Sequence, residues 1–125
     1  MQNNKLLFFI DEGGFEDPSD LFIELGYEIT IETNPRKATK LAKINQYDVL
    51  IAEFSYNPEF RDRVSNIESL LATLENSNPK IKVIVLFDEI YLPQLTQFKK
   101  RYRIDNTLTI PFAKQQLKAI LTLGN

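Results

Sequence analysis

The chain has 125 residues, which suits one domain and is too short for two. Hydrophobic residues make up 43% and charged residues 26% of it, the ordinary composition of a globular domain. The absence of cysteine and histidine excludes disulfides, thiol nucleophiles, Cys/His zinc sites and histidine-dependent acid–base relays. The formal net charge of −2 lacks the positive excess that sequence-independent nucleic-acid binding requires, so we expect no nucleic-acid partner.

The sequence carries no sign of a membrane or export signal. No segment approaches the roughly 18 consecutive apolar residues of a membrane span, and the N-terminus lacks the basic and then apolar pattern of a signal peptide. We therefore expect a cytoplasmic protein with no membrane partner. Because no repeat or linker interrupts the chain, we expect residues 1–125 to form a single, stand-alone domain.

Five segments are predicted to form strands. The first, third and fourth are nearly unbroken apolar runs, as expected for parallel strands that are buried on both faces. The second alternates apolar and polar residues, which indicates a half-exposed edge strand, and the fifth is short. In chain order they are Lys5–Ile10, Tyr27–Thr33, Asp48–Glu53, Ile81–Phe87 and Leu108–Ile110.

A helix is predicted after each strand. The first begins where Asp17 can cap it and Pro18 suits the first helical position, and Gly26 can end it. The second begins in the same way at Asn34 and Pro35. Apolar residues at helical spacing predict the other three helices. These span about Phe60–Leu74, Leu92–Tyr102 and Ala113–Leu123.

Strict alternation of strands and helices predicts the fold class. It favours right-handed crossovers and helices on both faces of a parallel sheet. We expect a three-layer α/β/α, doubly wound five-stranded sheet in the flavodoxin-like order 2-1-3-4-5. In such folds the functional residues follow the carboxyl ends of the strands, beside the switch point between strands 1 and 3.

Acidic residues gather at this edge of the predicted sheet. They follow strands 1, 3 and 4, and they are Asp11, Glu12, Glu53, Asp88 and Glu89. One interpretation is that most of them point into water. The other is a weak divalent site formed by Asp11, Glu12 and Glu53, because hard oxygen ligands suit Mg²⁺ or Ca²⁺. We expect no other cofactor.

Several pieces of the chain, in order, resemble bacterial response-regulator receiver domains. Ile10-Asp11-Glu12 resembles the acidic pair that closes strand 1, and Gly26-Tyr27-Glu28 resembles the entry to strand 2. Tyr47–Ile51 and Val83–Leu86 resemble strands 3 and 4, and Ile110-Pro111-Phe112 resembles the Lys-Pro-Phe that closes strand 5. The resemblance spans nearly the whole chain and implies a module of two-component signal transduction.

The same resemblance reveals departures at the central positions. In receivers the acidic pair holds a divalent cation, and this pair is kept as Asp11 and Glu12. Receivers also have a phosphoacceptor aspartate ending strand 3, a Ser/Thr ending strand 4, a lysine before the strand-5 proline and an aromatic switch residue in strand 5. Those four positions fall, in that order, on Glu53, Phe87, Ile110 and Thr107. The peptide bond before Pro111 is frequently cis in the family.

These replacements predict a loss of phosphoryl-transfer chemistry. A hydroxyl donor and a cation are missing, and each such group stabilises a transition state by on the order of 3 kcal/mol. We expect a phosphorylation-independent pseudo-receiver that is not an enzyme. Glu53 then either carries negative charge outward, in imitation of a phosphorylated aspartate, or only packs. The alternative function is a divalent-metal-dependent phosphoacceptor that uses Glu53.

A basic and aromatic segment near the fourth predicted helix is a candidate partner surface. Its residues are Tyr91, Phe98, Lys99, Lys100, Arg101, Tyr102 and Arg103. The simplest interpretation is a solvated helix end that complements the helix dipole. The resemblance implies another, because receivers commonly dock partners through helix 4, strand 5 and helix 5. An acidic protein or a homodimer would suit such a face.

Overall fold

The computed structural model describes residues 4–57 and 65–122 of the chain. Five parallel strands form one sheet in the order β2-β1-β3-β4-β5, so the predicted fold class and strand order are confirmed. Each strand begins and ends within two residues of its prediction. The bounds are β1 Asn4–Phe9, β2 Tyr27–Glu32, β3 Val49–Phe54, β4 Lys82–Asp88 and β5 Asn106–Ile110.

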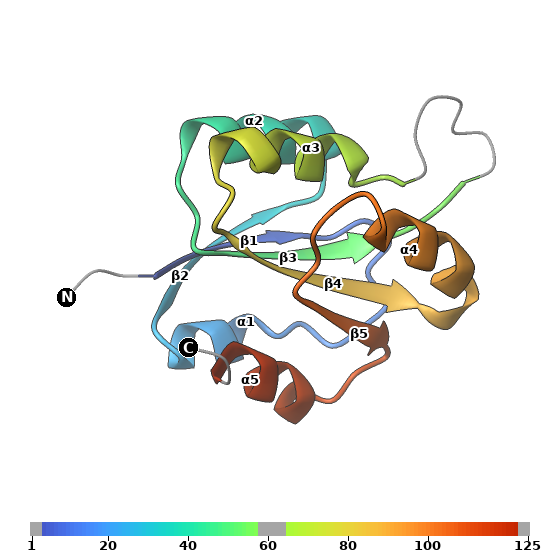
Figure 1. Ribbon diagram of the computed structural model, residues 1–125. Helices are drawn as coiled ribbons and strands as arrows, with labels where there is room; N and C mark the ends of the chain where they lie inside the picture. Colours follow the sequence, from blue (N-terminus) through green and yellow to red (C-terminus); the bar gives the residue numbers. More distant parts are fainter. Residues whose placement is uncertain (1–3, 58–64, 123–125) are drawn as a thin grey trace.

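Five α-helices cover the two faces of this sheet (Figure 1). Helices α1 (Ser19–Glu24) and α5 (Lys114–Thr122) lie on one face, below the sheet in Figure 1. Helices α2 (Pro35–Ile44), α3 (Glu68–Ser77) and α4 (Leu92–Lys99) lie on the other, and a 3-10 turn, η1 (Glu89–Tyr91), precedes α4. The predicted start of the third helix at residues 60–64, and position 123 in the fifth, lie outside the described residues. The prediction that residues 65–67 are helical is wrong, because they form a turn before α3, which continues to Ser77 and not to the predicted Leu74.

Alternation of side chains along the strands divides the core into two parts. In β1, Leu7 and Phe9 pack with the buried faces of α2, α3 and α4, whereas Leu6 and Phe8 pack with α1 and α5. Both clusters run across β1, β3 and β4, and all six residues of β3 are buried. Helices therefore pack on both faces of the sheet, and the carboxyl ends of its central strands project from this core.

The predicted start of α2 is confirmed. The side chain of Asn34 accepts hydrogen bonds from the backbone N–H groups of Arg36 at 2.9 Å and Lys37 at 3.1 Å. Pro35 follows at the first helical position, where its missing N–H leaves no intrahelical bond unmade. The helix is thus fixed at the end that follows β2.

The predicted start of α1 is wrong by one residue. Pro18 is the N-cap and α1 begins at Ser19. Asp17 instead makes a local turn, in which its Oδ1 accepts from the N–H of Ser19 at 2.9 Å and from its Oγ at 2.6 Å. These two bonds lower the pKa of Asp17. Gly26 lies just after the helix at φ +89°, a conformation that favours glycine, as its predicted role requires.

Among the described residues, no helix is both long and apolar enough to cross a membrane.

Candidate functional site

Glu53 joins the end of β3 to the loop that follows β1. Its side chain is buried, with 5% of the residue exposed. The carboxylate Oε1 accepts hydrogen bonds from the backbone N–H groups of Asp11 and Gly13, each at 2.9 Å. Gly13 lies at φ +74°, which few side chains tolerate, and this turn belongs to the loop that Glu53 holds. The carboxylate at the phosphoacceptor position is therefore an internal anchor.

Asp11 is held by side chains on the other side of the same loop. Its Oδ2 accepts from Ser55 Oγ at 2.6 Å and from Asn66 Nδ2 at 3.2 Å. Asn66 is 8% exposed and also donates to the carbonyl oxygen of Glu53 at 2.9 Å. Its Oδ1 accepts from the N–H of Ser55 at 2.8 Å and from Ser65 Oγ at 2.9 Å.

These five residues form one hydrogen-bonded group, which we call the strand-end network: Asp11, Glu53, Ser55, Ser65 and Asn66. Ser55, Ser65 and Asn66 were not predicted from the sequence. A single amide or hydroxyl near a strand end has no characteristic spacing, so only the packing of the β3–α3 connection against the β1 loop reveals them. Every member of the network forms hydrogen bonds with another part of the protein, which indicates a structural role.

The predicted convergence of acidic residues at this edge is supported by their effect on Tyr91. Desolvation raises the pKa of the Tyr91 hydroxyl, and the negative charges of nearby carboxylates raise it further. Those carboxylates are Glu12, Asp88, Asp11 and Glu53. Of these four, Glu53 is buried and the other three are exposed, as is Glu89.

The predicted divalent site needs Asp11, Glu12 and Glu53 to direct their carboxylates at one point. Within residues 4–57 and 65–122, no group of three or more acidic side chains is arranged to hold a metal ion. One oxygen of Asp11 and one of Glu53 are instead engaged by donors of the protein itself. The metal site stays a prediction, and these bonds give both carboxylates a task that the sequence did not reveal.

Apolar side chains occupy the positions where receivers have a hydroxyl and a lysine. Phe87 is 6% exposed and belongs to the core cluster beneath α3 and α4. Ile110 is half-buried and packs with Phe112 against the core beneath α1 and α5. Thr107 is half-buried in β5 opposite Val85. The Ile110–Pro111 peptide bond is cis, as the resemblance implied.

The interpretation of Glu53 as an outward-facing imitation of a phosphorylated aspartate does not agree with this geometry. The side chain is buried and its Oε1 binds inward to the β1 loop. The hydroxyl and aromatic residues that would respond to such a charge are replaced by Phe87 and Thr107.

The prediction that Phe98 belongs to a partner surface is wrong. Phe98 is 0% exposed, and its ring contacts Phe54 with centroids 5.4 Å apart and Tyr102 with centroids 4.9 Å apart. Leu95 and Phe98 lie three residues apart on one face of α4, and that face packs on the sheet. The helix also ends at Lys99 and not at the predicted Tyr102.

The aromatic and arginine residues of the same segment are engaged within the protein to different degrees. Tyr91 and Tyr102 are half-buried. The Tyr102 hydroxyl donates to Glu68 Oε2 at 3.1 Å, and Arg101 Nη1 lies 3.5 Å from the same oxygen. Lys99 and Lys100 are exposed, so they are the predicted residues most open to a partner.

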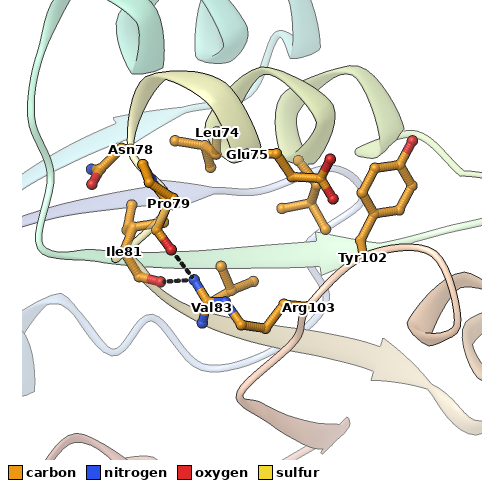
Figure 2. A pocket seen from close by; sticks show the side chains of 9 residues that line it. Leu74, Glu75, Asn78, Pro79, Ile81, Val83, Tyr102 and Arg103 are labelled. Atoms are coloured by element: carbon orange, nitrogen blue, oxygen red, sulfur yellow. Dashed lines mark hydrogen bonds between the residues drawn. The ribbon is translucent and has the colours of Figure 1, made fainter.

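Arg103 ties the α4–β5 loop to the start of β4. Its Nη2 donates to the carbonyl oxygens of Pro79 at 3.0 Å and Ile81 at 2.6 Å, the two bonds drawn in Figure 2. Its Nη1 pairs with Asp105. A cavity of about 180 Å³ lies beside it, between the end of α3 and the loop. Its lining includes Leu74, Val83 and Tyr102 (Figure 2).

No family model matches this sequence, and a search of curated proteins finds no match. Solved structures that are similar to it include receiver domains. The receiver domain of a Francisella response regulator gives a TM-score of 0.70 at 24% identity, over 97% of this chain and 95% of that one.

Two further solved structures share the fold. The receiver domain of a Pseudomonas aeruginosa sensor histidine kinase, solved with magnesium coordinated in its active-site cleft, gives 0.69 at 17% identity over 96% of this chain and 95% of that one. A member of a family of streptococcal redox sensors that evolved from two-component response regulators gives 0.70 at 16% identity. The match spans 95% of this chain and 49% of the redox sensor. The chain therefore has the receiver fold.

Proposed function

We propose that this chain is a pseudo-receiver: a phosphorylation-independent protein-interaction module in bacterial signal transduction, without enzymatic activity and acting in the cytoplasm. The observation that carries the proposal is the pair of hydrogen bonds from the Asp11 and Gly13 amides to Glu53 Oε1. A phosphoacceptor carboxylate must present an oxygen to the phosphorus atom in line with the leaving group. Amide donors on that carboxylate stabilise it in place and weaken it as a nucleophile.

The surroundings of Glu53 support the same proposal. Phosphoryl transfer relies on donors and cations placed around the transferring group. Phe87 supplies no donor and Ile110 supplies no charge. Lys114, at the start of α5, pairs with Glu16 at 3.3 Å and is not among the partners of Glu53. The streptococcal redox sensors are a further support, because they are a use of this fold in a family that evolved from response regulators.

A protein partner is proposed for the face formed by α4, β5 and α5. The exposed cations Lys99 and Lys100 favour an acidic partner there, and the exposed Leu92 at the start of α4 offers an apolar contact. A homodimer through this face is the alternative occupant. The charge-reversal variants described in the next subsection separate it from a dimer on the opposite side of the molecule.

The test is incubation with acetyl phosphate and Mg²⁺, followed by intact mass spectrometry. The proposal expects no adduct, whereas a phosphorylatable receiver treated in parallel gains about 80 Da, the mass of one phosphoryl group. A stable adduct on the wild-type chain that is absent from Glu53→Gln would contradict the proposal. That result would establish the alternative, a metal-dependent phosphoacceptor that uses Glu53.

A further inference from the structure

Opposite charges are segregated on the two sides of the edge strand β2. Residues 6–35 include eight Asp and Glu residues and no Lys or Arg, whereas residues 36–47 include four Lys and Arg residues and no acid. The four cations are Arg36, Lys37, Lys40 and Lys43 of α2, and all are exposed. In the described part of the chain, none of them pairs with a carboxylate.

Helix α1 presents the opposite charge. Asp20 and Glu24 lie four residues apart on one face of the helix, and both are exposed. Between them Ile23 is 62% exposed. The exposed side of α1 therefore carries two carboxylates, with Ile23 next to Asp20.

Helix α2 presents the matching pattern with positive charge. Ile44 is 71% exposed and follows Lys40 and Lys43 on the same side of the helix. Ile31 of β2, between the two helices, is 45% exposed. Of the five large hydrophobic residues that are exposed within residues 4–57 and 65–122, three thus lie on α1, β2 and α2. An apolar centre with a polar rim is the usual arrangement of a contact between proteins.

The two helices lie on opposite faces of the sheet and both contact β2, which has a strand neighbour on one side only (Figure 1). A two-fold axis parallel to the strands, placed outside β2, exchanges the two faces. It therefore brings the acidic α1 of one copy beside the basic α2 of the other, twice. A two-fold axis perpendicular to the sheet would instead bring α1 beside α1, where like charges repel.

We propose that the β2 side of this protein binds a second copy of the same chain, with α1 of each copy against α2 of the other. The arrangement is isologous and closes as a dimer. Side chains make the contact. In a parallel sheet, the outward amides of one strand lie between those of its neighbour, whereas this two-fold axis sets identical residues of the two copies at the same level. The two β2 strands therefore do not pair through their backbones.

A cavity with a mainly polar lining lies at the same edge. It measures about 160 Å³ and lies between β2 and α2, and it is lined by Lys5, Glu28, Thr30, Leu41, Asn45 and Tyr47. A two-fold axis along the strands keeps each residue at its level. Ile23 precedes β2 by four residues and so lies near the level at which this cavity opens. Because the cavity lining is mainly polar, the apolar contact in the proposed dimer is made outside the cavity, between the exposed Ile23 of one copy and the exposed Ile44 of the other.

The test uses charge reversal and sedimentation velocity over protein concentrations from about 10 μM to about 1 mM, the range of weak interfaces. The wild type is expected to dimerise at low salt and to dissociate as the Debye length falls from about 10 Å at 0.1 M salt to about 3 Å at 1 M. Asp20→Lys/Glu24→Lys and Lys40→Glu/Lys43→Glu should each weaken the dimer about tenfold or more. An equimolar mixture of the two variants should dimerise again.

Combining all four changes in one chain distinguishes the proposed geometry from the perpendicular one. This chain should dimerise with itself and should not dimerise with the wild type, because its α1 and the wild-type α2 are both basic. Association of the four-change chain with the wild type would contradict the proposal. Circular dichroism of each variant establishes that loss of the dimer is not loss of the fold.

The matched control is Lys99→Glu/Lys100→Glu, which makes the same change of charge on α4. It should leave the dimer intact, and so should Ile90→Ser, whereas Ile23→Ser should weaken the dimer. Loss of the dimer in the α4 variant but not in the α2 variant would place the interface on the α4 side and overturn the proposal. So would a wild type that stays monomeric throughout.

Binding of the wild type to phosphatidylglycerol vesicles, lost in Lys40→Glu/Lys43→Glu and without self-association, would likewise overturn it in favour of a membrane surface. None of these outcomes bears on Glu53, so the proposed function and the proposed dimer fail independently.

Discussion

Glu53 shows how a carboxylate at the end of a central strand can hold a neighbouring loop. The end of β3 lies at the edge of the sheet where the loop that follows β1 meets the loop that follows β3. The side chain of Glu53 extends to two amides of the loop that follows β1, which we call loop 1. The backbone carbonyl of Glu53 accepts a hydrogen bond from Asn66. Burial of a carboxylate is costly unless hydrogen bonds replace its hydration. The two amides do so here, and the result is a fixed loop with an engaged carboxylate.

The first prediction concerns the length of this side chain. Glu53→Asp should lower the free energy of unfolding, because the shorter carboxylate cannot reach both amides and an unsatisfied buried donor costs about 1–3 kcal/mol. Glu53→Ala should cost more, and Glu53→Gln less, since its carbonyl oxygen still accepts. Urea unfolding with an unchanged m-value measures these differences.

The control for this series is Glu12→Ala at the neighbouring exposed carboxylate. It should change the free energy of unfolding by no more than about 0.5 kcal/mol, as surface substitutions usually do. A Glu53→Asp protein as stable as the wild type would mean that the two amide bonds do not hold the loop.

A second prediction at this scale concerns Tyr102 and alkaline pH. Desolvation, followed by the hydrogen bond to Glu68 and the charge of Glu68, raises the pKa of Tyr102 above its ordinary value near 10. Because the folded state binds this proton more tightly, its contribution to stability is complete below the unfolded pKa and is lost as pH rises through the folded pKa.

Tyr102→Phe should therefore be less stable than the wild type near pH 8, and the difference should shrink by about pH 11. Urea unfolding across this range measures it. Because Tyr91 and Tyr27 also have raised pKa values, both proteins will lose stability at alkaline pH, and only the difference between them reports on Tyr102. A constant difference across the range would contradict the assignment.

At the scale of elements, the cap of α2 is the feature that sequence predicts most directly. Asn34→Ala removes the acceptor of two amides at the start of the helix and should cost about 1 kcal/mol, whereas Asn34→Asp should keep most of the stability. Thermal unfolding of the two variants provides the comparison. Equal losses in both would mean that the cap bonds contribute little.

The strands and helix order could be predicted because apolar runs and helical spacing reflect burial directly. Helix ends were predicted less well where local side-chain bonds decide them. Aspartate is a common N-cap residue, yet the bonds from Ser19 to Asp17 form a turn just before α1 and do not cap the helix. Arg103 could be read as part of a basic helix end, but its bonds to the Pro79 and Ile81 carbonyls place it in a loop after α4 has ended.

At the scale of the whole molecule, the core between the sheet and helices α2, α3 and α4 depends on aromatic residues contributed by β3 and α4. Phe98→Ala should remove about 3–5 kcal/mol, a large part of the 5–15 kcal/mol that stabilises a typical domain. Lys99→Ala/Lys100→Ala should change stability by about 0.5 kcal/mol or less. Urea unfolding compares them. A Phe98→Ala protein of normal stability would restore Phe98 as a candidate for the partner surface.

The candidate site was predictable only in part. The replacements at Phe87 and Ile110 follow from the resemblance alone, because they concern which residue stands at a known position. The role of Glu53 could not follow from it, since that depends on where the amides of Asp11 and Gly13 point. Asn66 was missed for the same reason: its side chain bonds to Asp11, Glu53 and Ser55, in segments that the sequence does not show to be neighbours.

The bonds from loop 1 to Glu53 have a consequence for hydrogen exchange. Asp11 is exposed and Gly13 partly so, and amides in such a loop ordinarily exchange with solvent quickly. Here both protons are held by an atom on the central strand β3, so their exchange requires that the loop lift from the sheet. The Asp11 and Gly13 amides should thus exchange slowly. Their rates would measure directly how often this edge of the sheet opens.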